Sequence, residues 1–183
     1  MNMHTAVAQT VIELPGAPGN MPHSEPMPYY LPGLSDIVVK DGRRKVPVGK
    51  VARISGWHPI RRGHGAITFD SALERDFLDR LVPLAVIDRA ISQPKTVYYN
   101  LWGDPRYYTT DFEIWLRYIP RGFELLGVRE THFFVEVKHT ELLDECSEQL
   151  EYGLTALRVG TGVPVFLFTE QEIHARHEEY FHV

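Results

Sequence analysis

Three carboxylates and one lysine lie in apolar stretches of this chain, where a charged side chain is expected to be buried at a cost in free energy. Glu136 and Lys138 are two residues apart in the run HFFVEVKH, so both side chains point to one face of the expected strand. Asp111 stands near the start of another strand-like run, and Glu74 lies at the edge of a helical apolar stripe. Burying a charge is costly unless it is paired or bound to a metal ion. The four residues are typical of a site where carboxylate oxygens hold a hard divalent cation and a lysine stands beside its attacking water.

A helix over residues 69–82 is expected to position Glu74. Leu73, Phe77 and Leu81 recur four residues apart and give the segment one apolar face, and the Asp-Ser pair at its start can cap it. Glu74 neighbours this face, so it can reach a site at the margin of a sheet. Taken alone, Glu74 would equally suit a solvent-exposed position.

Asp111 is expected on a hairpin. Aromatic and β-branched residues predict three strands, over 86–93, 96–102 and 107–118, with turn chemistry at 103–106. The last two strands would form a hairpin that delivers Asp111 near the start of its second arm. Glu113 is a second acid on the same face, and it remains an alternative to Asp111 as a ligand.

The strand with Glu136 and Lys138 is followed by a helix and another strand. Leucines at helical spacing predict a helix over 141–159, and the apolar run VPVFLF predicts a strand buried on both faces. A connection of about 24 residues suits a parallel crossover between the two strands. The remaining expectations are short β-like pieces over 37–54, a glycine-rich basic loop over 55–65, a loop with a short turn over 119–131, and a last helix from Glu170 to about Tyr180.

Composition indicates a globular chain with one main core. Hydrophobic residues make up 44% and charged residues 23% of 183 residues, which is enough for a single sizeable core. A single cysteine excludes an internal disulfide, and with no long apolar run or basic signal segment we expect a cytoplasmic protein without membrane insertion. We expect three parts: a proline-rich extended or disordered arm (1–36), a basic leader with short strands (37–65) and a catalytic α/β domain (66–183).

The charge distribution favours contact with nucleic acid despite a net charge of −5. Between Lys40 and His64, eight lysines and arginines face one acid, so this segment carries +7 and the remainder −12. Local basic patches of this kind bind phosphates whatever the net charge. A solvated, partly disordered leader is the alternative. The candidate DNA-binding residues are Arg43, Arg44, Lys45, Lys50, Arg53, Arg61 and Arg62.

The order of these motifs resembles the PD-(D/E)xK nuclease superfamily, and within it the catalytic domain of TnsA-like transposon endonucleases. The similar stretches are SGWHPIRRGHGAITFDSALERDFL, ISQP, YTTDF and FVEVK, and the resemblance as a whole covers about residues 52–168. Asp70 stands where this family often has glutamate, and Thr110 stands where it usually has proline. The resemblance implies a restriction-endonuclease-like α/β core, with a mixed central sheet flanked by helices.

The resemblance also implies roles for individual residues. Asp111, Glu136 and the Val137 backbone carbonyl would hold Mg²⁺ or Mn²⁺, with Glu74 completing the shell directly or through water. Lys138 would hold the attacking water, and Gln93 would support the site by hydrogen bonding. The expected reaction is hydrolysis of a DNA phosphodiester.

At the level of the family, the product would be a cut at the 5′ ends of a mobile element, in a bacterial, phage or mobile-element setting. The expected partners are a DDE-type transposase subunit and an ATPase regulator. Two other functions remain open: a stand-alone phage or restriction-type nuclease, and a non-catalytic module that binds DNA or a partner on the same fold. In a purely structural alternative, the four charges would only form salt bridges.

Overall fold

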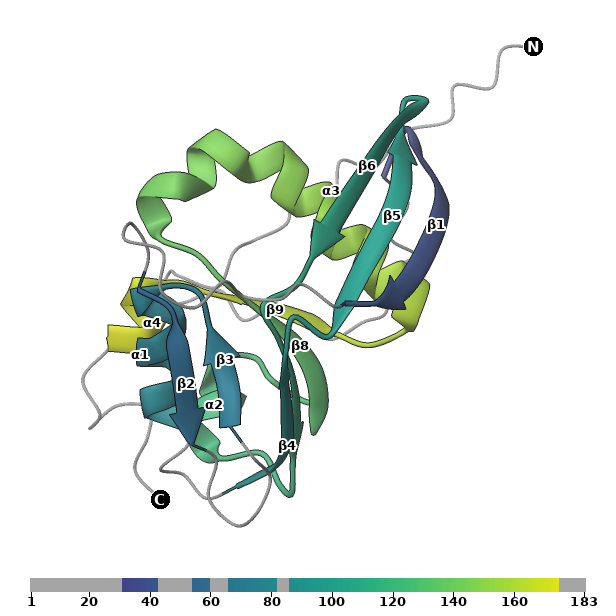
Figure 1. Ribbon diagram of the computed structural model, residues 1–183. Helices are drawn as coiled ribbons and strands as arrows, with labels where there is room; N and C mark the ends of the chain where they lie inside the picture. The colour runs from purple at the N-terminus through teal and green to yellow at the C-terminus, as the bar shows by residue number, and fades with distance from the viewer. Residues whose placement is uncertain (1–30, 43–53, 60–65, 82–85, 175–183) are drawn as a thin grey trace.

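The computed structural model describes residues 31–42, 54–59, 66–81 and 86–174, which form a mixed α/β fold (Figure 1). The elements in chain order are β1 (Leu34–Asp41), β2 (Gly56–Pro59), β3 (Ala66–Phe69), α1 (Ala72–Leu81), β4 (Ile87–Ser92), β5 (Lys95–Leu101), β6 (Asp104–Thr109), β7 (Phe112–Leu116), α2 (Arg121–Leu125), β8 (His132–Val137), the 3-10 turn η2 (Thr140–Leu142), α3 (Leu143–Thr161), β9 (Val165–Phe168) and α4 (Glu170–His174). The mixed α/β class predicted from the sequence is confirmed.

A four-stranded mixed sheet, in the order β4-β7-β8-β9, carries the strand with Glu136 and Lys138. Strand β7 runs antiparallel to both β4 and β8, whereas β8 and β9 are parallel. Helix α3 makes the connection between the two parallel strands, as the length of this segment predicted. Strand β8 therefore lies inside the sheet, paired on both edges.

The two faces of β8 look onto two separate hydrophobic clusters. Phe133, Val135 and Val137 belong to the cluster formed with α1, α2 and α4. Phe134 belongs to the second cluster, which α3 shares with β5 and β6. The alternation predicted for this strand is confirmed, so Glu136 follows Phe134 on the face toward α3.

A second, three-stranded antiparallel sheet has the order β1-β5-β6, and β2 and β3 form a separate hairpin. The chain passes from the four-stranded to the three-stranded sheet between β4 and β5, and returns between β6 and β7. These two connections, at Gln93–Pro94 and at Thr110–Asp111, run side by side along the boundary between the two sheets. We call this boundary the seam. The prediction of one continuous strand over 107–118 was wrong, because this break at Thr110–Asp111 divides it between two sheets.

Other predicted boundaries also need correction. The helix predicted over 69–82 begins only at Ala72, because Phe69 ends β3, and the predicted loop over 55–65 contains strand β2. The hairpin turn lies at Trp102–Gly103, where both φ angles are positive (54° and 90°) as a tight two-residue turn requires. The loop expected over 119–131 contains the short helix α2.

Two predicted elements match the structure over the ranges it describes. The predicted helix over 141–159 is found as α3 after the turn η2, and α4 begins at Glu170 as predicted. The rest of the predicted last helix lies outside the described residues. None of the described helices is long and apolar enough to cross a membrane.

Candidate active site

The residues predicted to be catalytic or to bind metal line one cavity of about 1010 Å³. It opens along the seam between the two sheets, beside the N-terminus of α1 and the free edge of β6. The predicted residues that line it are Glu74, Gln93, Asp111, Glu136, Val137 and Lys138. A helix, a strand crossing and a central strand, far apart in sequence, thus contribute to one site.

The seam between the sheets fixes Asp111 and Gln93. The Gln93 backbone N–H donates to the Asp111 carbonyl (2.7 Å), and the buried Thr110 hydroxyl donates to the Val135 carbonyl on β8 (2.9 Å). Gln93 has a φ of +48°, a left-handed conformation that non-glycine residues adopt rarely and that often marks functional positions. The two crossing segments are therefore tied to each other and to β8.

The Asp111 carboxylate points at the end of β8. Its Oδ2 accepts a hydrogen bond from the Val137 backbone N–H (2.8 Å), whereas the next N–H along, that of Lys138, bonds to the Phe168 carbonyl on β9. The N–H and C=O of an extended residue point to the same strand edge, so the Val137 carbonyl faces the Asp111 side. A carboxylate and a backbone carbonyl therefore approach the same part of the cavity.

Glu136 is deeply buried, and two protein groups contact its carboxylate. The Lys138 ammonium lies 3.3 Å from Oε1, which confirms that these two residues share one face of β8. The hydroxyl of Tyr108, on β6, donates to Oε2. The Tyr108 ring rests directly on Gly153 of α3, where an added Cβ would stand 2.6 Å from the ring.

Sequence reasoning missed Tyr108. With residues 107–118 taken as one strand, Tyr108 had no distinct role among the aromatic residues. The signal that could have found it is alternation within the shorter strand β6, which turns Tyr108 inward and Tyr107 outward.

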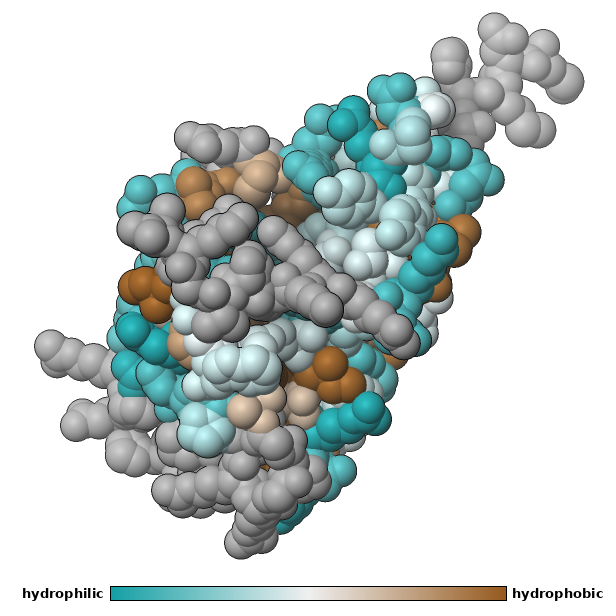
Figure 2. Space-filling view, in the orientation of Figure 1, coloured by the Kyte–Doolittle hydropathy of each residue, from teal (hydrophilic) through white to brown (hydrophobic). Residues whose placement is uncertain are grey.

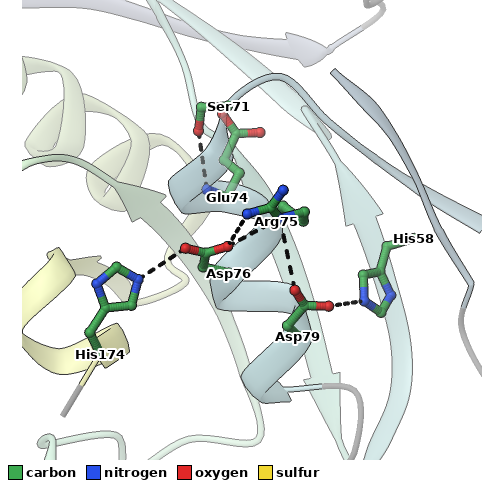
Figure 3. A network of polar contacts seen from close by, with 7 residues as sticks. All are labelled: His58, Ser71, Glu74, Arg75, Asp76, Asp79 and His174. Atoms are coloured by element: carbon green, nitrogen blue, oxygen red, sulfur yellow. Dashed lines mark hydrogen bonds and ion pairs between the residues drawn. The ribbon is translucent and has the colours of Figure 1, made fainter. Parts of the chain in front are cut away.

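Glu74 caps α1 and also borders the cavity. Its backbone N–H donates to Ser71 Oγ (3.1 Å), and its side-chain Oε2 accepts from the Asp70 N–H (2.8 Å). The sequence S-x-x-E is typical of this reciprocal capping, although the glutamate here reaches one residue further back than usual. Figure 3 shows Ser71 and Glu74 together at the first turn of the helix. Glu74 therefore has a structural role, in which one of its two carboxylate oxygens accepts a capping hydrogen bond.

The charged residues on the opposite face of α1 contact neighbouring elements. Asp79 contacts His58 of β2 (2.8 Å), and Asp76 contacts His174 of α4 (3.0 Å), while Arg75 bridges the two aspartates (Figure 3). These contacts connect α1 to β2 and α4, and so hold the helix that presents Glu74.

Burial and mutual repulsion control the charges of the site. The pKa of Asp111 is raised well above its ordinary value, first by burial of the carboxyl group and then by the charges of Glu136 and Glu74. Burial also raises the pKa of Glu136 and of Glu74. Burial alone would lower the pKa of Lys138, but the Glu136 and Asp111 carboxylates outweigh it and raise that pKa. Lys138 is therefore cationic at neutral pH and acts as a donor.

The oxygen ligands of the site are of the type that a hard divalent cation prefers. The carboxylate groups do not, however, surround one common point. Within the described ranges, no three acidic, histidine or cysteine side chains are grouped closely enough to hold a metal ion as they stand. Each carboxylate instead accepts from a protein donor. The charges of Glu136 and Glu74 raise the pKa of Asp111, and the charge of Glu74 raises that of Glu136, so a cation at this site would stabilise the ionised carboxylates. The Gln93 Oε1 is also buried, with no hydrogen-bond partner among the described residues, so the cavity wall keeps an unused oxygen acceptor.

Other predicted residues lie elsewhere. Glu113 is buried outside the cavity and contacts His132 (2.9 Å) on the same sheet, so it is not grouped with Asp111. All seven candidate DNA-binding residues lie outside the described residues, which leaves their role a prediction: Arg43, Arg44, Lys45, Lys50, Arg53, Arg61 and Arg62.

Comparison with known proteins does not place the chain in a family. No protein-family model matches the sequence, and a search of curated proteins finds no significant match.

Proposed function

We propose that this chain is a metal-dependent endonuclease that hydrolyses DNA phosphodiester bonds on a restriction-endonuclease-like core. One observation carries the proposal. Glu74, Gln93, Asp111, Glu136 and Lys138 come from separate elements and yet line one cavity, with the glutamate and lysine on a central strand. A cavity with several titratable groups of perturbed pKa is a physically reasoned candidate for an active site.

Asp111, Glu136 and the Val137 carbonyl would hold Mg²⁺ or Mn²⁺, with Glu74 bound directly or through water. A bound divalent ion would supply positive charge to the phosphate oxygens and lower the pKa of the attacking water. The Lys138 ammonium would donate a hydrogen bond to that water and favour its deprotonated form by its charge. Tyr108 and Lys138 hold the Glu136 carboxylate in place, and Gln93 offers its free oxygen to a water molecule.

Within this class we propose a TnsA-like role: cutting the 5′ ends of a mobile element together with a DDE-type transposase and an ATPase regulator. The support is the order of four sequence motifs, each of which contributes at least one residue to the lining of one cavity: Glu74, Gln93, Asp111, Glu136 and Lys138. A stand-alone nuclease would use the same site without these partners. Pull-down with the product of a neighbouring transposase gene separates the two.

A non-catalytic module that binds DNA or a partner on the same fold is the second candidate, and one observation favours a site without catalysis. Every carboxylate of the site already accepts a hydrogen bond from the protein, as a purely structural network would require. The capping bond of Glu74 is the clearest example, since it stabilises α1 whether or not a metal binds.

A nicking assay on supercoiled and branched DNA, with Mg²⁺ or Mn²⁺, tests the proposal. We expect cleavage by the wild-type chain, and a loss on the order of a hundredfold or more in Asp111→Ala and Lys138→Ala. Asp88→Ala removes an exposed strand carboxylate outside the cavity and serves as the matched control. If no metal-dependent nicking occurs, with or without transposase partners, the nuclease proposal fails and the binding module is favoured.

A further inference from the structure

The outer face of the three-stranded sheet exposes two aromatic rings side by side. Along β5 and β6, Tyr99 and Tyr108 turn inward to the cluster beneath α3, while Tyr98 and Tyr107 turn outward. The outward pair is 43% and 66% exposed. Large exposed aromatic side chains in a pair on a flat sheet are a typical feature of binding surfaces.

The two rings lie beside each other, and a lysine lies over one of them. Tyr98 and Tyr107 are directly opposite in the antiparallel register, with ring centroids 6.2 Å apart and planes inclined by 37°. The Lys40 ammonium of β1 lies 4.9 Å from the centre of the Tyr98 ring. Helix α3 packs on the other face of this sheet (Figure 1). Where the three-stranded sheet is coloured in Figure 2, it is mostly teal and white, so this surface is polar and not a continuous apolar patch.

This surface continues into the candidate active site. Tyr107 and its neighbour Arg106 line the cavity, and the next residue, Tyr108, donates to Glu136. Tyr107 and Tyr108 are adjacent residues of β6, the last strand of its sheet, and their side chains point to opposite faces, yet both line the cavity. The cavity therefore reaches around this edge of the sheet. A DNA strand lying across the outer face of β5 and β6 would pass over the edge at β6 into the cavity that the carboxylates line.

We propose that Tyr98, Tyr107 and Lys40 form a stacking platform for unpaired bases of a DNA strand that enters the cavity. Every base presents a flat π face to an aromatic ring, and a lysine beside the ring attracts the phosphate backbone. Bases inside a duplex are already stacked on one another, so the platform selects single-stranded, frayed or overhanging DNA. The inference rests on the proposed nuclease function, and it names the substrate form that this site accepts.

Binding measured without divalent metal tests the platform independently of cleavage. The probes are a fluorescein-labelled single-stranded oligonucleotide, the blunt duplex of the same sequence, and that duplex with a single-stranded overhang, all in EDTA. We expect the single strand and the overhang to bind more tightly than the blunt duplex. Tyr107→Ala and Tyr98→Ala should each weaken single-strand binding about tenfold, whereas Tyr107→Phe, which keeps the ring, should bind as the wild type does.

Two further readouts separate stacking from a structural role. A 2-aminopurine base in the single strand should lose fluorescence on binding to the wild type and to Tyr107→Phe, but not to the alanine variants. Lys40→Gln should lower the slope of log K against log salt by about 0.7, the value expected for one phosphate contact on a single strand. Tyr118→Ala, an exposed tyrosine on another part of the surface, is the matched control, and circular dichroism verifies that each variant is folded.

Three outcomes would overturn the platform: no preference for unpaired DNA, unchanged binding in folded Tyr98→Ala and Tyr107→Ala, or equal losses in Tyr107→Phe and Tyr107→Ala. If metal-dependent nicking is found while these binding results fail, the platform alone is wrong. If the chain neither nicks nor binds DNA, both proposals are wrong.

Discussion

Replacing Tyr108 by phenylalanine removes one hydroxyl group from the centre of the candidate site. That hydroxyl donates to Glu136 Oε2, and both residues are buried. Phenylalanine keeps the ring against α3, so the change is confined to the hydrogen bond. Among the residues that the structure describes, Lys138 would then be the one remaining partner of the Glu136 carboxylate.

The size of the effect follows from the kind of bond removed. A hydrogen bond to a charged group contributes about 1.5–3 kcal/mol to stability. At about 2–4 °C per kcal/mol for a chain of this size, the melting temperature should fall by roughly 3–12 °C. The Tyr108 hydrogen bond also lowers the pKa of Glu136, so its loss raises that pKa further above the ordinary value. If Glu136 binds metal, losing this support should weaken Mg²⁺ binding or activity by about 10–100-fold.

A second substitution reaches the same carboxylate from α3. In Gly153→Ala the new Cβ would stand 2.6 Å from Tyr108 Cγ, so the ring must move by nearly an ångström. Overpacking of this kind costs about 1–3 kcal/mol and would draw the hydroxyl away from Glu136. Tyr99→Phe is the control, because Tyr99 is also a buried tyrosine of this sheet but does not line the cavity.

Thermal melts and calorimetric Mg²⁺ titrations measure both effects. Tyr108→Phe and Gly153→Ala should each lower the melting temperature and weaken Mg²⁺ binding, while Tyr99→Phe should leave Mg²⁺ binding unchanged. Unchanged Mg²⁺ affinity in a folded Tyr108→Phe protein would refute a role for Tyr108 in positioning a metal ligand. An unchanged melting temperature would refute the hydrogen bond itself.

Three further outcomes are expected. The folded-state pKa values of Asp111 and Glu136 are raised above 3.8 and 4.5, so these carboxyl groups stay protonated to higher pH in the folded protein than in the unfolded chain. In metal-free protein the melting temperature should therefore fall as the pH rises above these values, and it should fall less steeply in Asp111→Asn. Mg²⁺ at a hundred times its Kd should stabilise the wild type by about 2.7 kcal/mol in calorimetry, an effect that Asp111→Ala should abolish. Gly162→Ala should lower the free energy of unfolding in urea by about 1–2 kcal/mol, because Gly162 caps the C-terminus of α3 with a φ of +69°, which alanine adopts at a cost. An added Cβ has no other atom within 4 Å, so this backbone strain is the whole effect. An unchanged unfolding midpoint would contradict the prediction.

The sequence determined which residues face which way along single elements. The two-residue spacing of Glu136 and Lys138 predicted a shared face, and their 3.3 Å contact confirms it. The length of the segment after them predicted the parallel pairing of β8 and β9. Both results follow from local periodicity and connection length, which are properties of the chain itself.

Only the tertiary structure decided how the elements meet. Alternation places a side chain on a face but does not say to which sheet a strand belongs, so the break at Thr110–Asp111 was missed. The contact between Tyr108 and Glu136 joins residues 28 apart through packing on α3, and no local pattern encodes it. The carboxylates meet at one cavity because two backbone segments cross between the sheets side by side. The positions of these segments depend on strand pairing and on the packing of two hydrophobic clusters, both of which join residues far apart in the sequence.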